Sequence, residues 1–570
     1  MPSSPSPSAP PLPSPSSPSS RFSQASPVPG PSAPGRPRSA AIGRRGLLVG
    51  AAVAVGAQAL NIRTAHAEPV RRDPFLLGVA SGDPLPDAVV LWTRLVADPF
   101  DAAAMGPRSV PVSWEVAADQ GFRRIVRRGV AAAEAGRGHS VHVDVRGLQP
   151  GRDYWYRFRA GRHLSPSGRT RTAPAAGARP GRLRLGVVNC QDWQNGYWPA
   201  YTALAAEDLD AVVHLGDYIY ETDPRGQYPD RLHTTPATPG IDQLLTLADY
   251  RARHALYKTD PALQGAHAAF PWIVTWDDHE VENNYAGLVD EIDDTGARHQ
   301  DTAALARERA AAYQAYYEHM PLRNPYRTGE PDYRLYRRFD FGDLLRLNVL
   351  DTRQYRTDQP GGHSQDFGPV ADGLGNTDGT LTGAEQEQWL RRGLSGSRAR
   401  WNVIAQQVMM SQIRFPDFLD PAHPLPPIAN LDQWDGYDPA RTRLLRFLRD
   451  AAVANPVVLA GDIHSSWFSD LRIDRDDLAT APVAVEFTST SVSSDFPAAF
   501  DAPIKALNPT LNPQVRYFDG LRRGYLRLDV DRERWLTDAR TVDSIAVRES
   551  PVRTSASWAV VAGEPGLVPA

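Results

Sequence analysis

Four short apolar runs, each ending in acidic, histidine, cysteine or tyrosine side chains, constrain the fold of this chain most strongly. They occupy residues 187–192, 212–221, 273–280 and 457–464. A run rich in β-branched residues indicates a buried strand, and open α/β sheets carry functional groups just past the carboxyl ends of such strands. Polar groups from four strand ends on one rim are typical of a site for a hard, multivalent cation. The pattern predicts a metal-dependent hydrolase.

The N-terminal region has the features of an export signal. Residues 1–40 of the 570-residue chain are mostly Pro, Ser, Ala and Gly, which predicts disorder. Arg44 and Arg45 then precede a mildly apolar stretch over residues 47–60 and an Ala-x-Ala site ending at Ala67. We interpret residues 1–67 as a disordered extension and twin-arginine signal peptide that is cleaved after Ala67. The alternative, a transmembrane anchor, is disfavoured because residues 47–60 are short for ~30 Å of hydrocarbon.

These observations predict a secreted or cell-wall-associated protein that is exported by the twin-arginine machinery. The net charge of −4 gives no global basic field, and the arginine pairs at 123–124 and 127–128 are short. We therefore expect no specific nucleic-acid partner. Cys190 is the only cysteine, so an intramolecular disulfide is excluded. An exported thiol is either buried as a small hydrophobic group or used as a ligand, and the strand-end position of Cys190 favours the ligand.

Composition changes along the chain and predicts two folded parts. Residues 74–175 alternate in short β-patterns separated by turns, which predicts a small β-sandwich of the fibronectin type III kind. Residues 172–180 have the composition of a linker. Residues 181–550 alternate strands with helices, the pattern of a layered α/β domain. We expect helices at 241–256, 301–319, from a capping box at 382–385 to residue 394, and at 441–454, with strands at 344–350, 401–406 and 456–460.

Asp217 and Tyr220 are candidate ligands at the second strand end. Gly216 lets the backbone turn sharply, and the two oxygens of Asp217 could bridge two cations. Tyr220 follows three residues later and can reach the same centre as a phenolate, which a hard trivalent cation favours. The alternatives are an aspartate that caps its own turn and a tyrosine that packs in the core.

The other two strand ends supply acidic and histidine groups. Residues 277–280 read Asp-Asp-His-Glu, and so many acidic groups together favour a bound cation unless the segment is a solvated loop. Asp462 and His464 are two residues apart, so in extended backbone they point the same way. Beyond these, Arg353 is a candidate for binding a substrate anion, with an Asp351–Arg356 ion pair as the equally supported alternative.

Taken together, these motifs resemble the PhoD-type alkaline phosphatases and phosphodiesterases, a branch of the metallophosphoesterases, over about residues 74–525. The resemblance implies a four-layer α/β/β/α domain with iron (Fe³⁺) and calcium (Ca²⁺). It implies that Asp217 bridges the metals and that His279 is catalytic. It assigns Cys190, Tyr220 and His464 to iron and Asp278 and Asp462 to calcium. The wider superfamily has Asp, Asp or Asn, and Asn at the positions of Cys190, Tyr220 and Asp278, which disfavours a plain zinc or manganese pair.

The implied function is that of a secreted alkaline phosphatase that hydrolyses phosphomonoesters and phosphodiesters by metal-assisted in-line attack. The sequence leaves open whether Asp277, Asn283 or Asn284 also bind metal. One alternative is a phospholipase D-like phosphodiesterase that acts on phospholipid head groups in transient contact with membrane lipid. A second is a non-catalytic, calcium-stabilised binding protein, which would need neither the lone cysteine nor the Asp-x-His pair.

Overall fold

The computed structural model describes residues 70–101, 104–222, 228, 231, 243–290, 301–361, 367–417 and 426–570. The predicted signal peptide over residues 1–67 lies outside these ranges. Within them, no helix is both long and apolar enough to cross a membrane.

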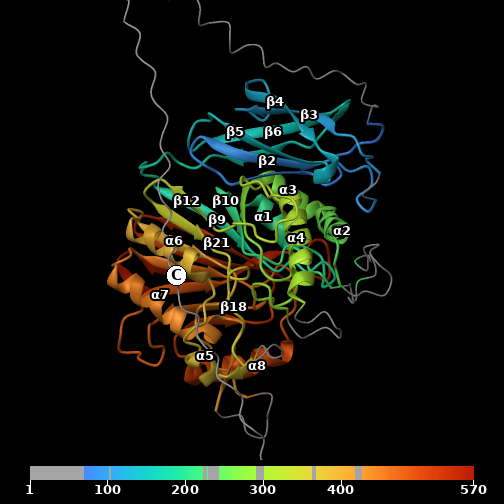
Figure 1. Cartoon of the computed structure of the whole chain (residues 1–570). Helices are drawn as coiled ribbons and strands as arrows, with labels where there is room; N and C mark the ends of the chain where they lie inside the picture. The colour runs from blue at the N-terminus through green and yellow to red at the C-terminus, as the bar shows by residue number, and fades with distance from the viewer. Residues whose placement is uncertain are drawn as a thin grey trace, which may run out of the picture. The chain divides into compact units, whose positions relative to one another are not determined.

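The first sheet has ten strands and is parallel at its centre (Figure 1). Strands β9 (Arg182–Val188), β10 (Ala211–His214) and β11 (Pro271–Val274) pair in parallel, and β10 and β11 are buried throughout. Continuous apolar runs are typical of strands covered on both faces. The carboxyl ends of these three strands therefore lie at the same edge of the sheet, where their polar extensions begin.

The second sheet has seven strands in the order β12-β13-β15-β17-β19-β18-β20. Its parallel core consists of β13 (Leu345–Val349), β15 (Trp401–Ala405), β17 (Pro456–Ala460) and β19 (Ala484–Thr488). These bounds confirm the strands predicted at 344–350, 401–406 and 456–460. The remaining strands are β12 (Arg337–Phe341), β18 (Ser466–Leu471) and β20 (Val515–Asp519), and β14 (Phe367–Pro369) pairs with β16 (Ile428–Asn430) as a separate ribbon.

The two sheets pack face to face, with helices on the outer face of each. Val187 and Val213 of the first sheet share one buried cluster with Val403 of the second. The alternate residues Val188 and Val212 turn the other way, toward the helices of the first sheet. In the second sheet, Ile404 and Val458 likewise face the outer helices. They share a cluster with Leu390 of α6 (Gly383–Ser395) and Leu445 of α7 (Asp438–Asp450). Side chains of a strand alternate between its two faces, so each run builds two cores at once.

The helices among the described residues are α1 (Pro199–Ala206), α2 (Leu247–Lys258), α3 (Pro261–Ala269), α4 (Thr302–His319), α5 (Val370–Gly375), α6 (Gly383–Ser395), α7 (Asp438–Asp450) and α8 (Ala498–Leu511). Of these, α2, α4, α6 and α7 confirm the predicted helices with shifted ends, and the others were not predicted. The prediction for 241–256 began too early, because a capping box between Thr246 and Asp249 starts α2 there. The capping box predicted at 382–385 does not form, since Thr382 makes no side-chain cap.

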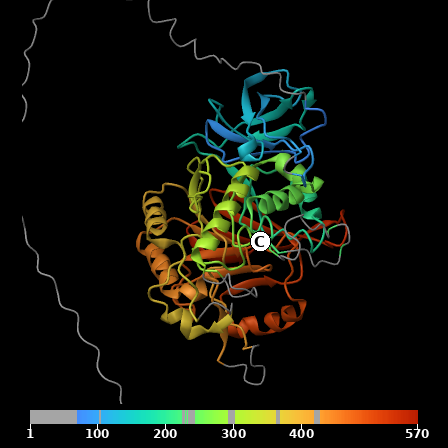
Figure 2. The ribbon, with the colours of Figure 1, turned by 45° about the vertical axis from the view of Figure 1, so that its right-hand side comes forward.

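The N-terminal β-rich part, blue to cyan in Figure 2, is a two-sheet sandwich. It shares one of its sheets with the rest of the molecule. Strands β3 (Val110–Ala117), β4 (Ile125–Ala133), β6 (Asp153–Ala160), β7 (His163–Leu164) and β8 (Gly168–Arg171) form its separate five-stranded sheet. Its other layer consists of β1 (Val79–Gly82), β2 (Ala88–Arg94) and β5 (Ser140–Arg146). Because β1 pairs in parallel with β11, this layer continues the first large sheet across the predicted boundary near residue 180.

The C-terminal segment also belongs to the first sheet. Strands β21 (Gly524–Asp531), β22 (Arg534–Val542), β23 (Val552–Val561) and β24 (Glu564–Pro569) extend it antiparallel from β9. The predicted domain end at residue 550 therefore falls short of the folded part. The last two strands lacked a clear sequence signal because β23 is only half-buried and its pattern does not alternate strictly.

Candidate metal centre

Residues from the ends of β9, β10, β11 and β17 converge in three overlapping groups, each able to hold a metal ion. The first group is Cys190, Asp217 and His464, the second Asp217, Asp278 and His279, and the third Asp277, Asp278 and Asp462. Within each group the ligand atoms lie within 4.8 Å of one another. Asp217 belongs to the first two groups and Asp278 to the last two. The six predicted strand-end residues other than Tyr220 are thus brought to one site.

Tyr220 joins the first group through its hydroxyl. That oxygen lies 2.9 Å from Asp217 Oδ2, to which it donates, and 3.1 Å from His464 Nε2. The amide of Asn189 donates to Cys190 Sγ at 2.9 Å. Burial, and after it the Asp217 charge, raise the pKa of both the Cys190 thiol and the Tyr220 phenol well above their ordinary values. A cation at this position would reverse that preference, because it stabilises the thiolate and the phenolate.

Two carboxylate oxygens of the site support the presence of a cation. Asp217 Oδ1 and Asp278 Oδ1 are buried and have no hydrogen-bond donor among the described residues. Arg353 is the nearest cationic group to the latter, with Nη2 at 3.4 Å. A buried carboxylate oxygen without a donor is unfavourable unless a cation neutralises it. Asp217 is shared by a group with sulfur and imidazole donors, beside the Tyr220 phenol, and a group with carboxylate and imidazole donors, so these residues fit a metal pair.

The backbone at the site is left-handed at four of the candidate ligands. The φ angles of Cys190, Asp217, Asp462 and His464 lie between 53° and 65°. Residues other than glycine rarely adopt this region, and such strain clusters at functional sites. Gly216 itself has φ +116°, and a Cβ there would collide with Asp277. Gly216 was predicted to bring the turn close to the metal. The close approach of its backbone to Asp277 is the physical basis of that role.

His279 faces the same space and is held by a buried glutamate. Its Nδ1 lies 2.7 Å from Glu221 Oε2, and the backbone N–H of Asn283 donates to the other oxygen of Glu221 at 3.1 Å. Burial lowers the pKa of His279, but the charges of Glu221 and Asp217 outweigh it and raise that pKa well above its ordinary value. Glu221 therefore holds the ring in a defined orientation. Its Nε2 is left for a ligand.

Arg353 does not lie where a substrate anion could reach it. Its guanidinium is fully buried and donates to Asp277, to Asp432 at 2.8 Å and to Asp462 at 2.6 Å. The prediction that Arg353 holds the substrate anion is therefore not supported by the geometry, because acidic neighbours occupy all of its nitrogens. The alternative, an ion pair between Asp351 and Arg356, does not form either.

That alternative paired Asp351 with Arg356, and the structure separates their roles. Asp351 Oδ1 accepts the backbone N–H groups of Arg353 and Gln354 at 3.1 and 3.0 Å, so it caps its own turn. Arg356 pairs with Asp432 at 2.6 Å. Asp432 follows β16 in a segment without a long apolar run, which is why the strand-end pattern did not reveal it.

Glu280 and Ser494 are two further groups that the sequence pattern did not assign. The carboxylate of Glu280 accepts the backbone N–H groups of Asp217, Tyr218 and Asp277 at 3.1, 2.6 and 2.8 Å, which ties two strand-end turns together. Burial, and then the Asp217 charge, raise the pKa of Glu280 to about 8. Ser494 donates to the Tyr220 hydroxyl at 2.6 Å and carries no motif that could have identified it. Both groups position ligands.

Asp277, Asn283 and Asn284, whose role as ligands the sequence left open, also have defined positions at the site. Asn283 and Asn284 line the cavity, and the backbone N–H of Asn284 donates to Asp278 Oδ2 at 2.8 Å. Asp277 belongs to the third metal group but already accepts from Arg353. Burial, opposed by Arg353, leaves the pKa of Asp277 well above its ordinary value.

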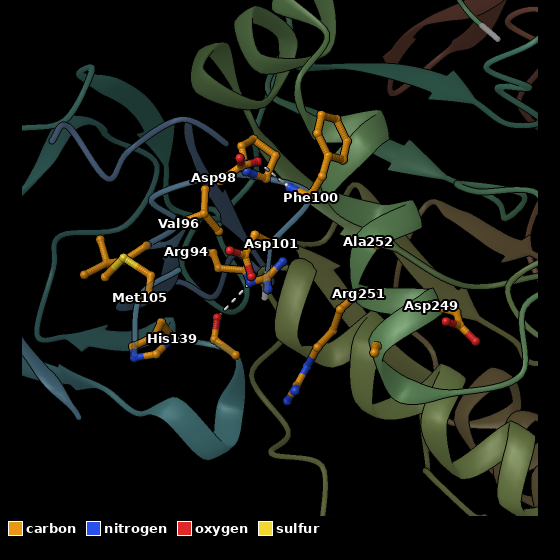
Figure 3. A pocket seen from close by; sticks show the side chains of 14 residues that line it. Arg94, Val96, Asp98, Phe100, Asp101, Met105, His139, Asp249, Arg251 and Ala252 are labelled. Atoms are coloured by element: carbon orange, nitrogen blue, oxygen red, sulfur yellow. Dashed lines mark hydrogen bonds between the residues drawn. The ribbon is translucent and has the colours of Figure 1, made fainter. Parts of the chain in front are cut away.

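A cavity of about 640 Å³ opens onto this cluster. Asp217, Asp278, His279, Asp462 and His464 line one side of it. A smaller cavity of about 100 Å³ lies elsewhere, between β2 and α2 (Figure 3). Its arginines are already occupied, since Arg94 donates to the carbonyl oxygen of Gly138 and Arg251 to Glu318. Of these two cavities, the one of about 640 Å³ is lined by the candidate metal-binding groups.

Comparison with known proteins identifies the family of this chain. The model of the PhoD-like phosphatase family matches residues 185–539, and that of the PhoD-like phosphatase N-terminal domain matches residues 60–174. Alkaline phosphatase D of Bacillus subtilis (strain 168) is 44% identical over 499 residues, which cover 87% of this chain and 82% of that protein. The chain belongs to the PhoD-like phosphatase family.

A solved structure described as the structure of PhoD superposes with a TM-score of 0.79 at 43% identity and covers 88% of this chain and 93% of its own. The family resemblance predicted from the strand-end motifs is thus confirmed, together with the enzyme class. This PhoD-like phosphatase is a phosphoric ester hydrolase with mixed α/β sheets and candidate metal-binding groups at their shared edge.

Gly216 provides a test of how the backbone builds the centre. We expect Gly216→Ala to lower the free energy of unfolding by about 2 kcal/mol or more, because its φ is unfavourable for alanine and its Cβ would displace Asp277. Bound metal should fall as well, as measured by elemental analysis beside chemical denaturation. Gly265→Ala in α3, where nothing lies within 4 Å of the added Cβ, is the control and should be neutral or stabilising. Equal behaviour of the two variants would contradict the role of Gly216.

Proposed function

We propose that this PhoD-like phosphatase is a secreted alkaline phosphatase that hydrolyses phosphomonoesters and phosphodiesters by metal-assisted in-line attack and releases phosphate. The observation that carries the proposal is the sharing of Asp217 between two metal-binding groups of different chemistry. The first of these groups offers the Cys190 thiol and the His464 imidazole, with the Tyr220 phenol beside them, and the second offers the Asp278 carboxylate and the His279 imidazole. The paired sheets with flanking helices support the four-layer α/β/β/α metallophosphoesterase arrangement for the catalytic part and a fibronectin III-like assignment for the β-sandwich.

The donor types favour iron and calcium. Cys190, Tyr220 and His464 with Asp217 would hold Fe³⁺, because phenolate and thiolate require a cation that strongly lowers their pKa values. Asp278 and Asp462 with Asp217 would hold Ca²⁺, which prefers oxygen ligands. When bound, such a pair polarises a phosphoryl group and activates an oxygen nucleophile for attack in line with the leaving group.

The chain's own groups supply the remaining chemistry. His279 lines the cavity, and Glu221 holds its Nδ1, so Nε2 is the atom that donates a proton to the departing alkoxide. In place of anion binding, we assign Arg353 a positioning role. It holds Asp462 at 2.6 Å and Asp432 at 2.8 Å, which limits the repulsion among the buried carboxylates. It thereby keeps the predicted calcium ligand ionised and oriented.

A second candidate function is phospholipase D-like hydrolysis of phospholipid head groups with transient contact to membrane lipid. It is favoured by one observation, the apolar side chains of α8 beside the cavity. Phe500 lines the cavity and is 39% exposed, and Leu507 on the same helix is 36% exposed. Comparison of a phosphomonoester with phosphatidylcholine as substrates separates the two functions.

The central test is the chelator sensitivity of the mature protein, which begins at Glu68. We expect it to hydrolyse p-nitrophenyl phosphate and its bis-ester at alkaline pH, to lose activity with a strong chelator and to regain it with Fe³⁺ and Ca²⁺ together. The ratio of the two rates decides between monoesterase and diesterase. Turnover that survives complete metal removal, shown by elemental analysis, would refute metal-assisted attack.

His279 is expected to be a proton donor and not a ligand. The variant His279→Gln should lower kcat by about 10²–10⁴-fold with near-normal metal content, since a general acid contributes on that scale. Glu221→Gln, which leaves the ring in place with a weaker partner, should give a smaller loss. Because His279 also belongs to the second metal-binding group, loss of metal from His279→Gln would reassign it as a ligand.

Export is tested independently of catalysis. Replacing Arg44 and Arg45 together by lysine should leave the precursor inside the cell, because the twin-arginine pathway reads that pair. Cell fractionation measures this, and mass spectrometry of the exported protein should find Glu68 as its first residue. Ser39→Ala, which lies outside the arginine pair, is the control. Normal export of the double lysine variant would rule out this route.

A further inference from the structure

The cavity over the metal centre is lined by two unlike sets of side chains. Besides the carboxylates and histidines, its lining includes the apolar side chains Phe367, Phe415, Ile463, Phe496, Phe500 and Ile504. We call these six residues the apolar wall. The described lining residues of this cavity include no lysine or arginine. A substrate therefore meets both negative, metal-binding groups and hydrocarbon in this cavity.

The apolar wall is firmly supported from behind. Phe415 and Ile504 are buried in one cluster with Trp467 and Phe518, and Phe367, Ile463 and Phe496 pack against that cluster. The rings of Phe367 and Phe415 meet edge to face at 5.4 Å, and those of Phe496 and Phe518 lie 6.0 Å apart. Such packing fixes side chains in place, so these five residues of the wall form a preformed surface, and the exposed Phe500 lies beside them on the cavity lining.

The wall begins directly at the ligands. Ile463 lies between Asp462 and His464 in the chain, and all three residues line the cavity. Hydrocarbon is therefore available to an ester substituent of a phosphoryl group held at the metal centre. A polar alcohol loses hydrogen bonds to water on that surface, whereas an apolar alcohol gains by leaving water.

We infer that the apolar wall is a subsite for an apolar alcohol group that stays on phosphorus when the leaving group departs, so that the enzyme prefers diesters whose retained substituent is a larger alkyl or aryl group over those whose retained substituent is small. This inference rests on the proposed function and specifies its substrate class. The absence of basic residues from the described lining also disfavours substituents that carry a second anionic group.

The test holds the leaving group constant. p-Nitrophenyl methyl phosphate and p-nitrophenyl hexyl phosphate release the same nitrophenolate and differ by five methylenes. Each fully buried methylene is worth up to about fourfold in binding. We expect kcat/KM of the wild-type holoenzyme for the hexyl ester to exceed that for the methyl ester by about tenfold or more. Equal values would overturn the inference while leaving the phosphodiesterase function intact, and hydrolysis of neither ester, with metals bound, would refute that function instead.

Variants locate the effect on the wall. Phe496→Ala combined with Phe500→Ala should reduce the hexyl-to-methyl ratio to about twofold or less, with turnover of the methyl ester and metal content little changed. Leu507→Ala, on α8 and exposed but not a lining residue, is the matched control and should keep the wild-type ratio. An unchanged ratio in the double variant would overturn the assignment.

A measurement on the wild-type enzyme guards against a misfolded variant. Hexylphosphonate should inhibit hydrolysis of the methyl ester about tenfold more strongly than methylphosphonate, and equal inhibition would contradict the subsite. A p-nitrophenyl dodecyl ester below its micelle concentration separates two sources of the apolar group. A rate that stops rising after hexyl identifies a small alkyl or aryl alcohol, and a rate that rises further identifies a lipid chain.

Discussion

Mutual repulsion of buried carboxylates is the constraint on which this site depends. Asp217, Asp277, Asp278, Asp432 and Asp462 are all largely or wholly removed from water within one cluster. Arg353 neutralises part of this charge from inside the protein, and its own pKa rises because four of these carboxylates outweigh its burial. Burial raises the pKa of Asp462 to about 6 even with Arg353 beside it. The remaining negative charge is the physical reason for a cation at the orphan oxygens of Asp217 and Asp278.

Strained backbone turns position these mutually repelling groups. Left-handed backbone at Cys190, Asp217 and Asp462 shortens the path from each strand to its ligand. Such conformations persist only when the surroundings determine them. Glu280 supplies this for the turn at Asp217 by accepting the backbone N–H groups of Asp217 and Tyr218, and by also accepting the N–H of Asp277 it ties that turn to the next strand end. Two glycines allow the close approach, since a Cβ at Gly216 would collide with Asp277 and one at Gly461 would lie 2.7 Å from Asn189 Cγ.

The sequence predicted the parts of the fold and site that depend on local pattern. Apolar runs identified the central strands, and the polar groups that follow them identified Cys190, Asp217 and His464. Contacts between residues that lie far apart in the chain could not be predicted from the sequence. The burial of Arg353 depends on Asp432, 79 positions away along the chain, and Ser494 reaches Tyr220 across 274 positions. The junction of β1 with β11 was missed for the same reason, because sheet neighbours distant in sequence leave no local signal.

The division of the cavity lining into charged and apolar groups follows from how the second sheet ends. β17 delivers Asp462 and His464 to the metal centre, and Ile463 between them packs into the cluster beneath Phe415 and Ile504. One three-residue turn therefore contributes to both linings, and covalent geometry keeps Ile463 beside the two candidate ligands. In the subsite that we infer, a substituent on the phosphoryl group would approach hydrocarbon close to this turn. The candidate ligands and the inferred subsite thus share a single strand end.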